Sequence, residues 1–153
     1  MSNILVVDDE AIIAMQLEER LNAMGYTVSG IAASGEDAIE KARRLNPDLV
    51  LMDIVMPGRL NGIEAAKTVA EELDIPVVFV TSFADDATIA KAKLVGPYGY
   101  IVKPFNELEI KAGIEVALFR KTAERELRKG ATSADESRSH GKGGEEGESG
   151  TEY

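Results

Sequence analysis

Side chains that could carry chemistry stand directly after four short apolar runs of this 153-residue chain. They are Asp8, Asp9 and Glu10 after Ile4–Val7, Asp53 after Leu49–Met52, Thr81 after Val77–Val80, and Lys103 after Tyr100–Val102. Clustered carboxylates repel one another unless a cation joins them, and an all-oxygen ligand set favours Mg²⁺. An ammonium and a hydroxyl are suitable donors to the oxygens of a phosphoryl group in transfer.

The available nucleophile is also a carboxylate. The chain has no cysteine, and its one histidine, His140, stands in a polar C-terminal stretch. Thiol nucleophiles are therefore excluded, and so is histidine general-base catalysis in the folded body. Because carboxylates can accept phosphoryl groups, the residue types favour Mg²⁺-assisted phosphorylation of an aspartate.

Each of these residues alone also has a purely structural explanation. Asp8 and Asp9 could cap the first helix, and Asp53 could be a turn residue. Thr81 could cap a helix through its hydroxyl, and Lys103 could be a solvated lysine before a proline. Taken together, residues that follow four separate strands and meet at one edge of a sheet favour a functional site, since ligands of open parallel sheets bind there.

The spacing of apolar residues predicts the elements that position this site. The four runs, and a weaker one at Thr27–Ala32, are rich in Val, Ile and Leu, as strands buried on both faces are. Segments of helical period lie between and after them: Ala11–Met24, Glu36–Leu45, Ile63–Leu73, Asp86–Val95 and a long one from Asn106 to about Lys129. Gly25 and Ser34 mark a helix end and a helix start. Strict alternation predicts one α/β domain with a doubly wound parallel sheet.

Composition narrows the class of protein. The formal charge of −10 at pH 7, without a Lys/Arg stripe, argues against nucleic acid as the primary partner. The lack of cysteine excludes disulfides and Cys-based metal sites. The sequence shows no signal peptide or membrane span, so we expect a cytoplasmic location. Residues 130–153 are rich in Gly, Ser and acidic side chains, and we expect this tail to be disordered.

Four fragments carry a family resemblance: Ile4–Glu10, Pro47–Pro57, Val80–Ser82 and Gly99–Phe105. In this order and at this spacing, the chain from Asn3 to about Leu118 resembles the receiver domain of two-component response regulators. The resemblance implies a flavodoxin-like sheet with strand order 2-1-3-4-5 and phosphorylation by a sensor histidine kinase. It also implies a cis peptide bond between Lys103 and Pro104.

The resemblance assigns a role to each site residue. Asp53 is the phosphoacceptor, and Asp8 and Asp9 hold Mg²⁺ directly or through water, together with the backbone carbonyl of Val55. Lys103 pairs with the acyl phosphate. Thr81 moves toward the phosphoryl group after transfer, and Tyr100 is the aromatic switch residue.

Two departures from the family pattern concern the loops around the site. The loop Met56–Gly62 is one residue longer than the commonest form, and Asn61 stands where Asp is usual. Val55 and Phe83 occupy the two positions that tune phosphoryl lifetime in the family, and neither can orient a water by hydrogen bonding. We therefore expect a long-lived phosphorylated state.

The last helix continues past the usual end of the family. An apolar stripe runs along it at Ala112, Val116, Phe119, Ala123 and Leu127. It could be a solvated helix end, or it could support a homodimer or dock a partner.

We expect a stand-alone regulator, comprising a receiver domain over 1–129 and the tail over 130–153. Its only catalysis would be its own phosphorylation and dephosphorylation. It would signal through a target protein or phosphorelay partner, with a possible homodimer through the fourth helix, last strand and last helix. A binding module without phosphate turnover is an alternative, which the intact set of site residues disfavours. A haloacid-dehalogenase-type phosphatase needs Asp-x-Asp spacing, which Asp8-Asp9-Glu10 lacks.

Overall fold

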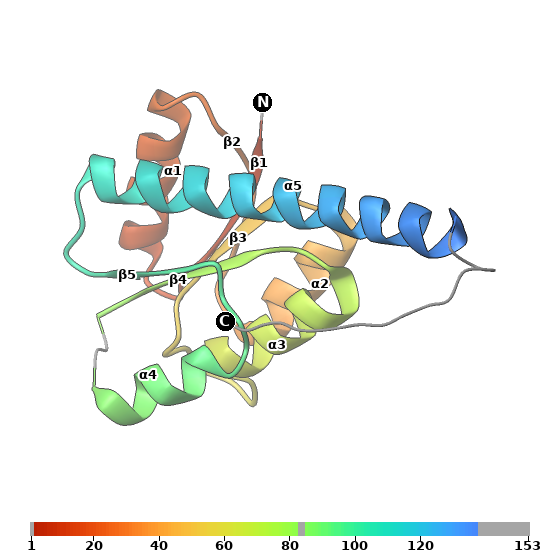
Figure 1. Cartoon of the computed structure of the whole chain (residues 1–153). Helices are drawn as coiled ribbons and strands as arrows, with labels where there is room; N and C mark the ends of the chain where they lie inside the picture. The colour runs from red at the N-terminus through yellow and green to blue at the C-terminus, as the bar shows by residue number, and fades with distance from the viewer. Residues whose placement is uncertain (1, 83–84, 138–153) are drawn as a thin grey trace. The chain divides into compact units, whose positions relative to one another are not determined.

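The computed structural model describes residues 2–82 and 85–137 of the chain. Strands and helices alternate throughout this part, as the sequence predicts (Figure 1). In chain order they are β1 (Asn3–Val7), α1 (Ala11–Ala23), β2 (Thr27–Ala32), α2 (Gly35–Leu45), β3 (Leu49–Met52), α3 (Gly62–Leu73), β4 (Val77–Thr81), α4 (Asp86–Lys93), β5 (Gly99–Val102) and α5 (Glu107–Ser137).

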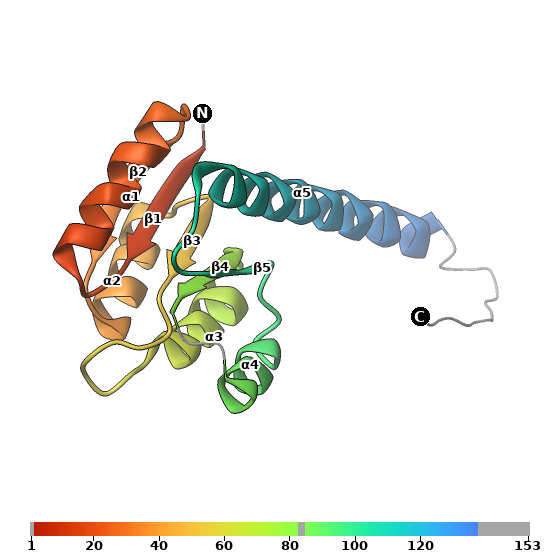
Figure 2. The same ribbon diagram turned by 90° about the vertical axis from the view of Figure 1, so that its left-hand side faces the viewer.

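The strands form one parallel sheet in the order β2-β1-β3-β4-β5, which confirms the predicted order. Side chains along a strand point to alternate faces, so Leu5 and Val7 belong to one core cluster and Ile4 and Val6 to the other. Helices α2, α3 and α4 complete the first cluster, while α1 and the first part of α5 complete the second. Figures 1 and 2 show α3 and α4 side by side in both views. Burial on both faces explains the continuous apolar runs.

Side chains cap the starts of α2, α3 and α5, and Asp85 caps α4 in the same way. The Ser34 hydroxyl accepts a hydrogen bond from the Asp37 N–H at the start of α2, as predicted. Asn61 and Glu64 form a reciprocal capping box at the start of α3. Asn106 accepts from the Glu109 N–H at 2.8 Å, and the Glu109 carboxylate accepts from the Asn106 N–H at 2.9 Å. These caps satisfy N–H groups that have no partner within the helix.

The chain divides into a compact unit over Met1–Arg120 and a second unit that begins at Lys121. Helix α5 continues to Ser137, so the predicted helix end near Lys129 is too early. The division into a domain over 1–129 and a tail over 130–153 stays a prediction. The apolar side chains of Val116, Phe119 and Leu127 are exposed. The dimer or docking role of this stripe stays a prediction. The expected disorder of the tail, with His140, concerns mostly positions outside the described residues.

Among the residues that the structure describes, no helix has the length and apolar character needed to cross a membrane.

Candidate functional site

The carboxyl ends of three neighbouring strands bring polar side chains into the interior. Asp8 follows β1, Asp53 follows β3, and Thr81 is the last residue of β4; their exposed fractions are 2%, 6% and 1%. Backbone hydrogen bonds continue the sheet at this edge, since Asp53 N–H donates to the Val7 carbonyl and Lys103 N–H donates to the Thr81 carbonyl, both at 2.9 Å. The parallel strands therefore place the predicted residues at one edge.

Lys103 joins the two buried aspartates. Its ammonium donates to Asp8 Oδ2 at 2.8 Å and to Asp53 Oδ2 at 3.2 Å. It also lies 3.8 Å from Glu10 Oε1. The peptide bond between Lys103 and Pro104 is cis, as the resemblance implies. Lys103 is thus part of the acidic cluster and is not the solvated lysine of the structural alternative.

Burial and charge act in opposite directions on the acceptor. Desolvation raises the pKa of the Asp53 carboxyl, and the charge of Asp8 raises it further. The Lys103 ammonium and the Thr81 hydroxyl lower it, but the net shift of the pKa is upward. Ionised Asp53 therefore lies in a site that would gain from an added positive charge.

The opposite balance holds for Lys103. Burial lowers the pKa of its ammonium, but the hydrogen bond to Asp8 and the charges of both aspartates outweigh burial and raise the pKa. Lys103 is therefore positively charged at neutral pH and can neutralise an oxygen anion held beside Asp53.

The carboxylates of Asp8, Glu10 and Asp53 form a group that could hold a metal ion. Each offers an oxygen, and these oxygens lie within 4.8 Å of one another. A hard divalent cation such as Mg²⁺ suits such oxygen donors. The N–H of Glu10 donates to Asp8 Oδ1 at 2.9 Å, which fixes the two residues relative to each other.

The group includes Glu10, to which the sequence analysis gave no metal-binding role, and does not include Asp9, to which it did. Asp9 is exposed and is not one of the clustered residues. Because side chains of an extended chain alternate in direction, Asp8 and Glu10 can face the same way while Asp9 faces the other. This alternation is the sequence signal that could have identified Glu10. The role of Asp9 as a metal ligand stays a prediction.

Val55 lies in the loop that follows β3, two positions after the acceptor. Its N–H donates to Asp53 Oδ1 at 3.4 Å. Its side chain is about half exposed. This contact keeps the Val55 backbone next to Asp53, where the resemblance expects its carbonyl to complete the metal ligands.

The two switch residues lie on adjacent strands. Thr81 contacts the site directly, because its hydroxyl hydrogen-bonds to the Asp53 carboxylate. Tyr100 on β5 is half-buried, and its ring meets Phe79 edge-on with 6.3 Å between ring centroids. Burial and the charge of Asp85 raise the pKa of Tyr100. The expectation about Phe83 and phosphoryl lifetime concerns a position outside the described residues.

The helix-cap alternatives for Asp8, Asp9 and Thr81 do not account for their positions. Helix α1 is preceded by Glu10, with no side-chain cap from either aspartate. The cap of α4 is Asp85, whose carboxylate accepts from the Thr88 N–H, so Thr81 does not serve as a cap there.

Comparisons with known proteins agree with this geometry. The family model described as "response regulator receiver domain" matches residues 4–115. The transcriptional regulatory protein PdtaR of Mycobacterium tuberculosis is 39% identical over 117 residues, which are 76% of this chain and 57% of that protein. Chemotaxis protein CheY of Thermotoga maritima is 37% identical over 103 residues, 67% of this chain and 85% of CheY.

A solved structure gives the same result. The signal receiver domain of a modulated diguanylate cyclase from Desulfovibrio desulfuricans G20 has a TM-score of 0.78 at 36% identity, covering 81% of this chain and 98% of that one. The chain spans only about half the length of most of the curated relatives that it matches, PdtaR among them. From the family match and the arrangement of its site, this chain belongs to the response regulator receiver domain family.

Proposed function

We propose that this chain accepts a phosphoryl group on Asp53 in two-component signalling. The observation that carries the proposal is the placement of the Lys103 ammonium between the Asp8 and Asp53 carboxylates, at 2.8 and 3.2 Å. Phosphoryl transfer depends mainly on positioning and charge neutralisation, and this site supplies a nucleophile and a fixed cation.

The chemistry follows from the groups present. An oxygen of Asp53 attacks the phosphorus of a phosphohistidine on a sensor kinase, a P–O bond forms, and the P–N bond breaks as the imidazole leaves. Lys103 and the Thr81 hydroxyl donate hydrogen bonds to the phosphoryl oxygens. Asp8, Asp53 and the Val55 carbonyl would hold Mg²⁺, together with the carboxylate of Asp9 or Glu10. The bound Mg²⁺ would supply neutralising charge at the phosphoryl oxygens.

Phosphorylation then acts on protein–protein contacts. The acyl phosphate adds charge and strong acceptors beside Thr81. Movement of the Thr81 hydroxyl toward it would let Tyr100 turn inward and change the surface formed by α4, β5 and α5 within Met1–Arg120. The partners would be a sensor histidine kinase and a downstream target or phosphorelay protein, with a homodimer as one form of the output and the cytoplasm as the location.

Intact-mass measurement tests the acceptor. With Mg²⁺ and a small phosphodonor, the mass of the protein should rise by one phosphoryl group, and Asp53→Asn should abolish the gain. Asp48→Asn is a matched control, because Asp48 lies directly before β3 and Asp53 directly after it. The Asp48 carboxylate accepts a hydrogen bond from the Asn3 N–H and lies at the opposite end of the strand from the site. Full labelling of Asp53→Asn would contradict the assignment, and no labelling of the parent would favour a binding module.

The switch has its own test. Beryllofluoride or phosphorylation should change self-association or partner binding of the parent protein. Thr81→Ala and Tyr100→Ala should weaken that response, because each removes one step between the phosphoryl group and the surface. Variants that respond as the parent does would show that the signal takes another route.

A further inference from the structure

The loop between β3 and α3 begins and ends on the backbone beside the acceptor. At its end, the N–H of Gly62 donates to the Ile54 carbonyl at 2.8 Å. A Cβ on residue 62 would lie 1.9 Å from the Asp53 carbonyl oxygen, so only glycine fits there. The base of the loop is therefore fixed next to Asp53.

The far part of the loop is held by a residue of another element. Glu36, in the first turn of α2, accepts with Oε2 from the N–H of Arg59 at 3.0 Å and from the N–H of Leu60 at 3.3 Å. Gly58 has a φ of +103°, and a Cβ there would lie 2.9 Å from Glu36 Oε1. The carboxylate of Glu36 thus fits closely against residues 58–60.

The helix backbone reinforces this contact. A Cβ on Gly35 would lie 2.7 Å from the Leu60 carbonyl oxygen. The first turn of α2 already has its cap in Ser34, so Glu36 is not needed to cap the helix. Backbone N–H groups, its own first and then those of Arg59 and Leu60, hold the pKa of the Glu36 carboxyl below its usual value.

We propose that Glu36 is a positioning residue for the Mg²⁺ site. The Glu36 carboxylate holds the backbone of Arg59 and Leu60. Residues 55–58 connect these two residues to the base of the loop, so Glu36 also fixes the path of residues 55–58. This segment includes the Val55 backbone, which lies beside Asp53. The contact spans the loop that is one residue longer than the common family form. The inference rests on the proposed function, since it assumes that Mg²⁺ binds at the acidic cluster.

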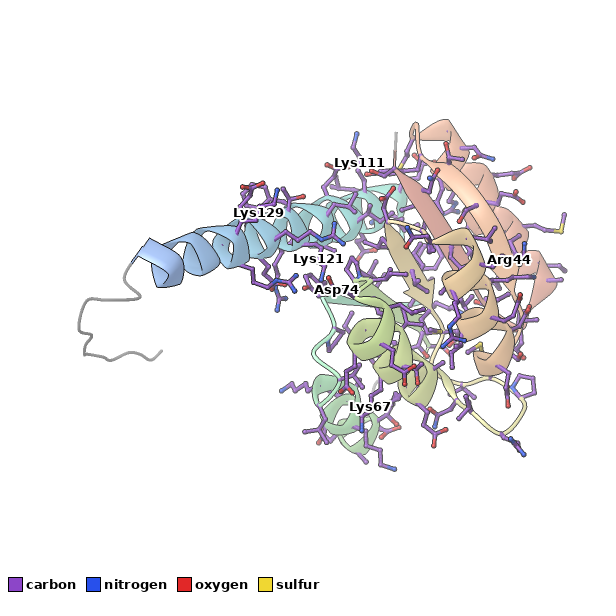
Figure 3. The ribbon with its side chains drawn as sticks, turned by 90° about the vertical axis from the view of Figure 1, so that its right-hand side faces the viewer. Arg44, Lys67, Asp74, Lys111, Lys121 and Lys129 are labelled. Atoms are coloured by element: carbon purple, nitrogen blue, oxygen red, sulfur yellow. The ribbon has the colours of Figure 1, made fainter. Side chains whose placement is uncertain are left out.

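Substitutions at Glu36 test this with a control on the same turn. Glu36→Ala removes the acceptor, and Glu36→Gln keeps one acceptor oxygen without the charge. Asp37→Asn makes the same change of charge at the next residue, whose carboxylate pairs with Lys41 at 3.1 Å and not with the loop. Figure 3 labels Arg44, which pairs with Glu40 further along α2.

Two measurements give the expected result. In metal-free protein, hydrogen exchange at the amides of Arg59 and Leu60 should become faster in Glu36→Ala but not in Asp37→Asn. In a Mg²⁺ titration followed by amide chemical shifts, Glu36→Ala should bind about tenfold more weakly than the parent, the lower end of the range for groups that orient metal ligands. The Mg²⁺ affinity of Glu36→Gln should lie between those of Glu36→Ala and the parent protein. The affinity of Asp37→Asn should equal that of the parent.

Phosphorylation kinetics separate positioning from general damage. At saturating Mg²⁺, Glu36→Ala should be phosphorylated at close to the parent rate, because its acceptor and Lys103 are unchanged. Faster amide exchange with unchanged Mg²⁺ affinity would overturn the proposal, and so would unchanged exchange. If Glu36→Ala does not fold, the same comparisons apply to Glu36→Gln. A parent protein that shows no response to Mg²⁺ would instead contradict the proposed function.

Discussion

Charge balance at the site is decided by very few residues. Asp8, Glu10 and Asp53 present carboxylates to the single ammonium of Lys103. This leaves two negative charges when all are ionised, which is the charge that one divalent cation neutralises. When no cation is bound, the Lys103 ammonium offsets the repulsion between the Asp8 and Asp53 carboxylates.

Lys103→Met should therefore destabilise the metal-free protein. It leaves the Asp8 and Asp53 carboxylates buried without a cationic partner. Removing one partner of a buried ion pair costs about 3 kcal/mol or more of stability. Urea unfolding in chelator should show this loss, and it should shrink in Mg²⁺ because the metal replaces the missing charge. Lys67→Met, at an exposed residue of α3 (Figure 3), is the control. Equal stability of parent and Lys103→Met would refute this account of the cluster.

Most of the site could be predicted one residue at a time, because each side chain follows a recognisable strand. Asp8, Asp53, Thr81 and Lys103 meet as expected. The presence of Glu10 in the carboxylate group was harder to predict, because it depends on the direction of each side chain after β1 ends. The hydrogen bonds that Glu36 accepts from the loop could not be predicted, because they join residues that become neighbours only when the chain folds.

At the scale of elements, single contacts join segments that are distant in sequence. Tyr26, buried just before β2, donates its hydroxyl to the carboxylate of Glu115 on α5. Burial first, and then the hydrogen bond and charge of Glu115, raise the pKa of Tyr26 well above its usual value of 10.0. This contact links the edge of the sheet to the helix that covers it within Met1–Arg120.

Tyr26→Phe should lower the free energy of unfolding by about 1 kcal/mol at neutral pH, the usual net value of a hydrogen bond. The folded-state pKa lies above the unfolded one, so this contribution is full below pH 10.0 and is lost as pH rises from there toward the folded pKa. Urea unfolding of parent and variant should thus converge in alkaline buffer. A difference that stays constant across that pH range would show that the tyrosine proton is not involved.

Close backbone packing makes a second prediction for this scale. Gly62→Ala should destabilise the fold by about 3 kcal/mol, because its Cβ would lie 1.9 Å from the Asp53 carbonyl oxygen and the backbone must move. Gly99→Ala is the control: its Cβ would meet Val78 at 3.4 Å, an ordinary contact. Thermal unfolding of the two variants should separate them clearly. Equal melting temperatures would mean that the loop adjusts without cost.

The order of elements could be predicted because strands and helices differ in the period of their apolar residues. The end of α5 could not. The sequence predicts a helix to about Lys129, before the Gly- and Ser-rich stretch that starts at Gly130, yet the helix continues to Ser137. Glycine inside a helix costs about 1 kcal/mol relative to alanine, which disfavours the helix without forbidding it. The polar residues that follow carry no apolar period that could mark either helix or tail.

At the scale of the whole molecule, the site and both core clusters lie within Met1–Arg120. The cut between the two units falls after Arg120, whose guanidinium lies 4.5 Å from the centre of the Tyr98 ring. A chain that ends at Arg120 therefore keeps this cation–π contact, every site residue and every buried apolar residue of the core. The unit should fold and bind metal by itself.

We expect residues 1–120 and the full chain to be stabilised equally by Mg²⁺. A ligand that binds only the folded state adds about 2.7 kcal/mol at one hundred times its dissociation constant, so equal affinity gives an equal gain in the free energy of unfolding. Urea unfolding with and without Mg²⁺ measures that gain in both chains. Asp53→Asn in each chain should reduce it, because one carboxylate of the cluster is lost. A smaller gain in the shorter chain alone would mean that residues beyond Arg120 support the metal site, since the site residues themselves are the same in both.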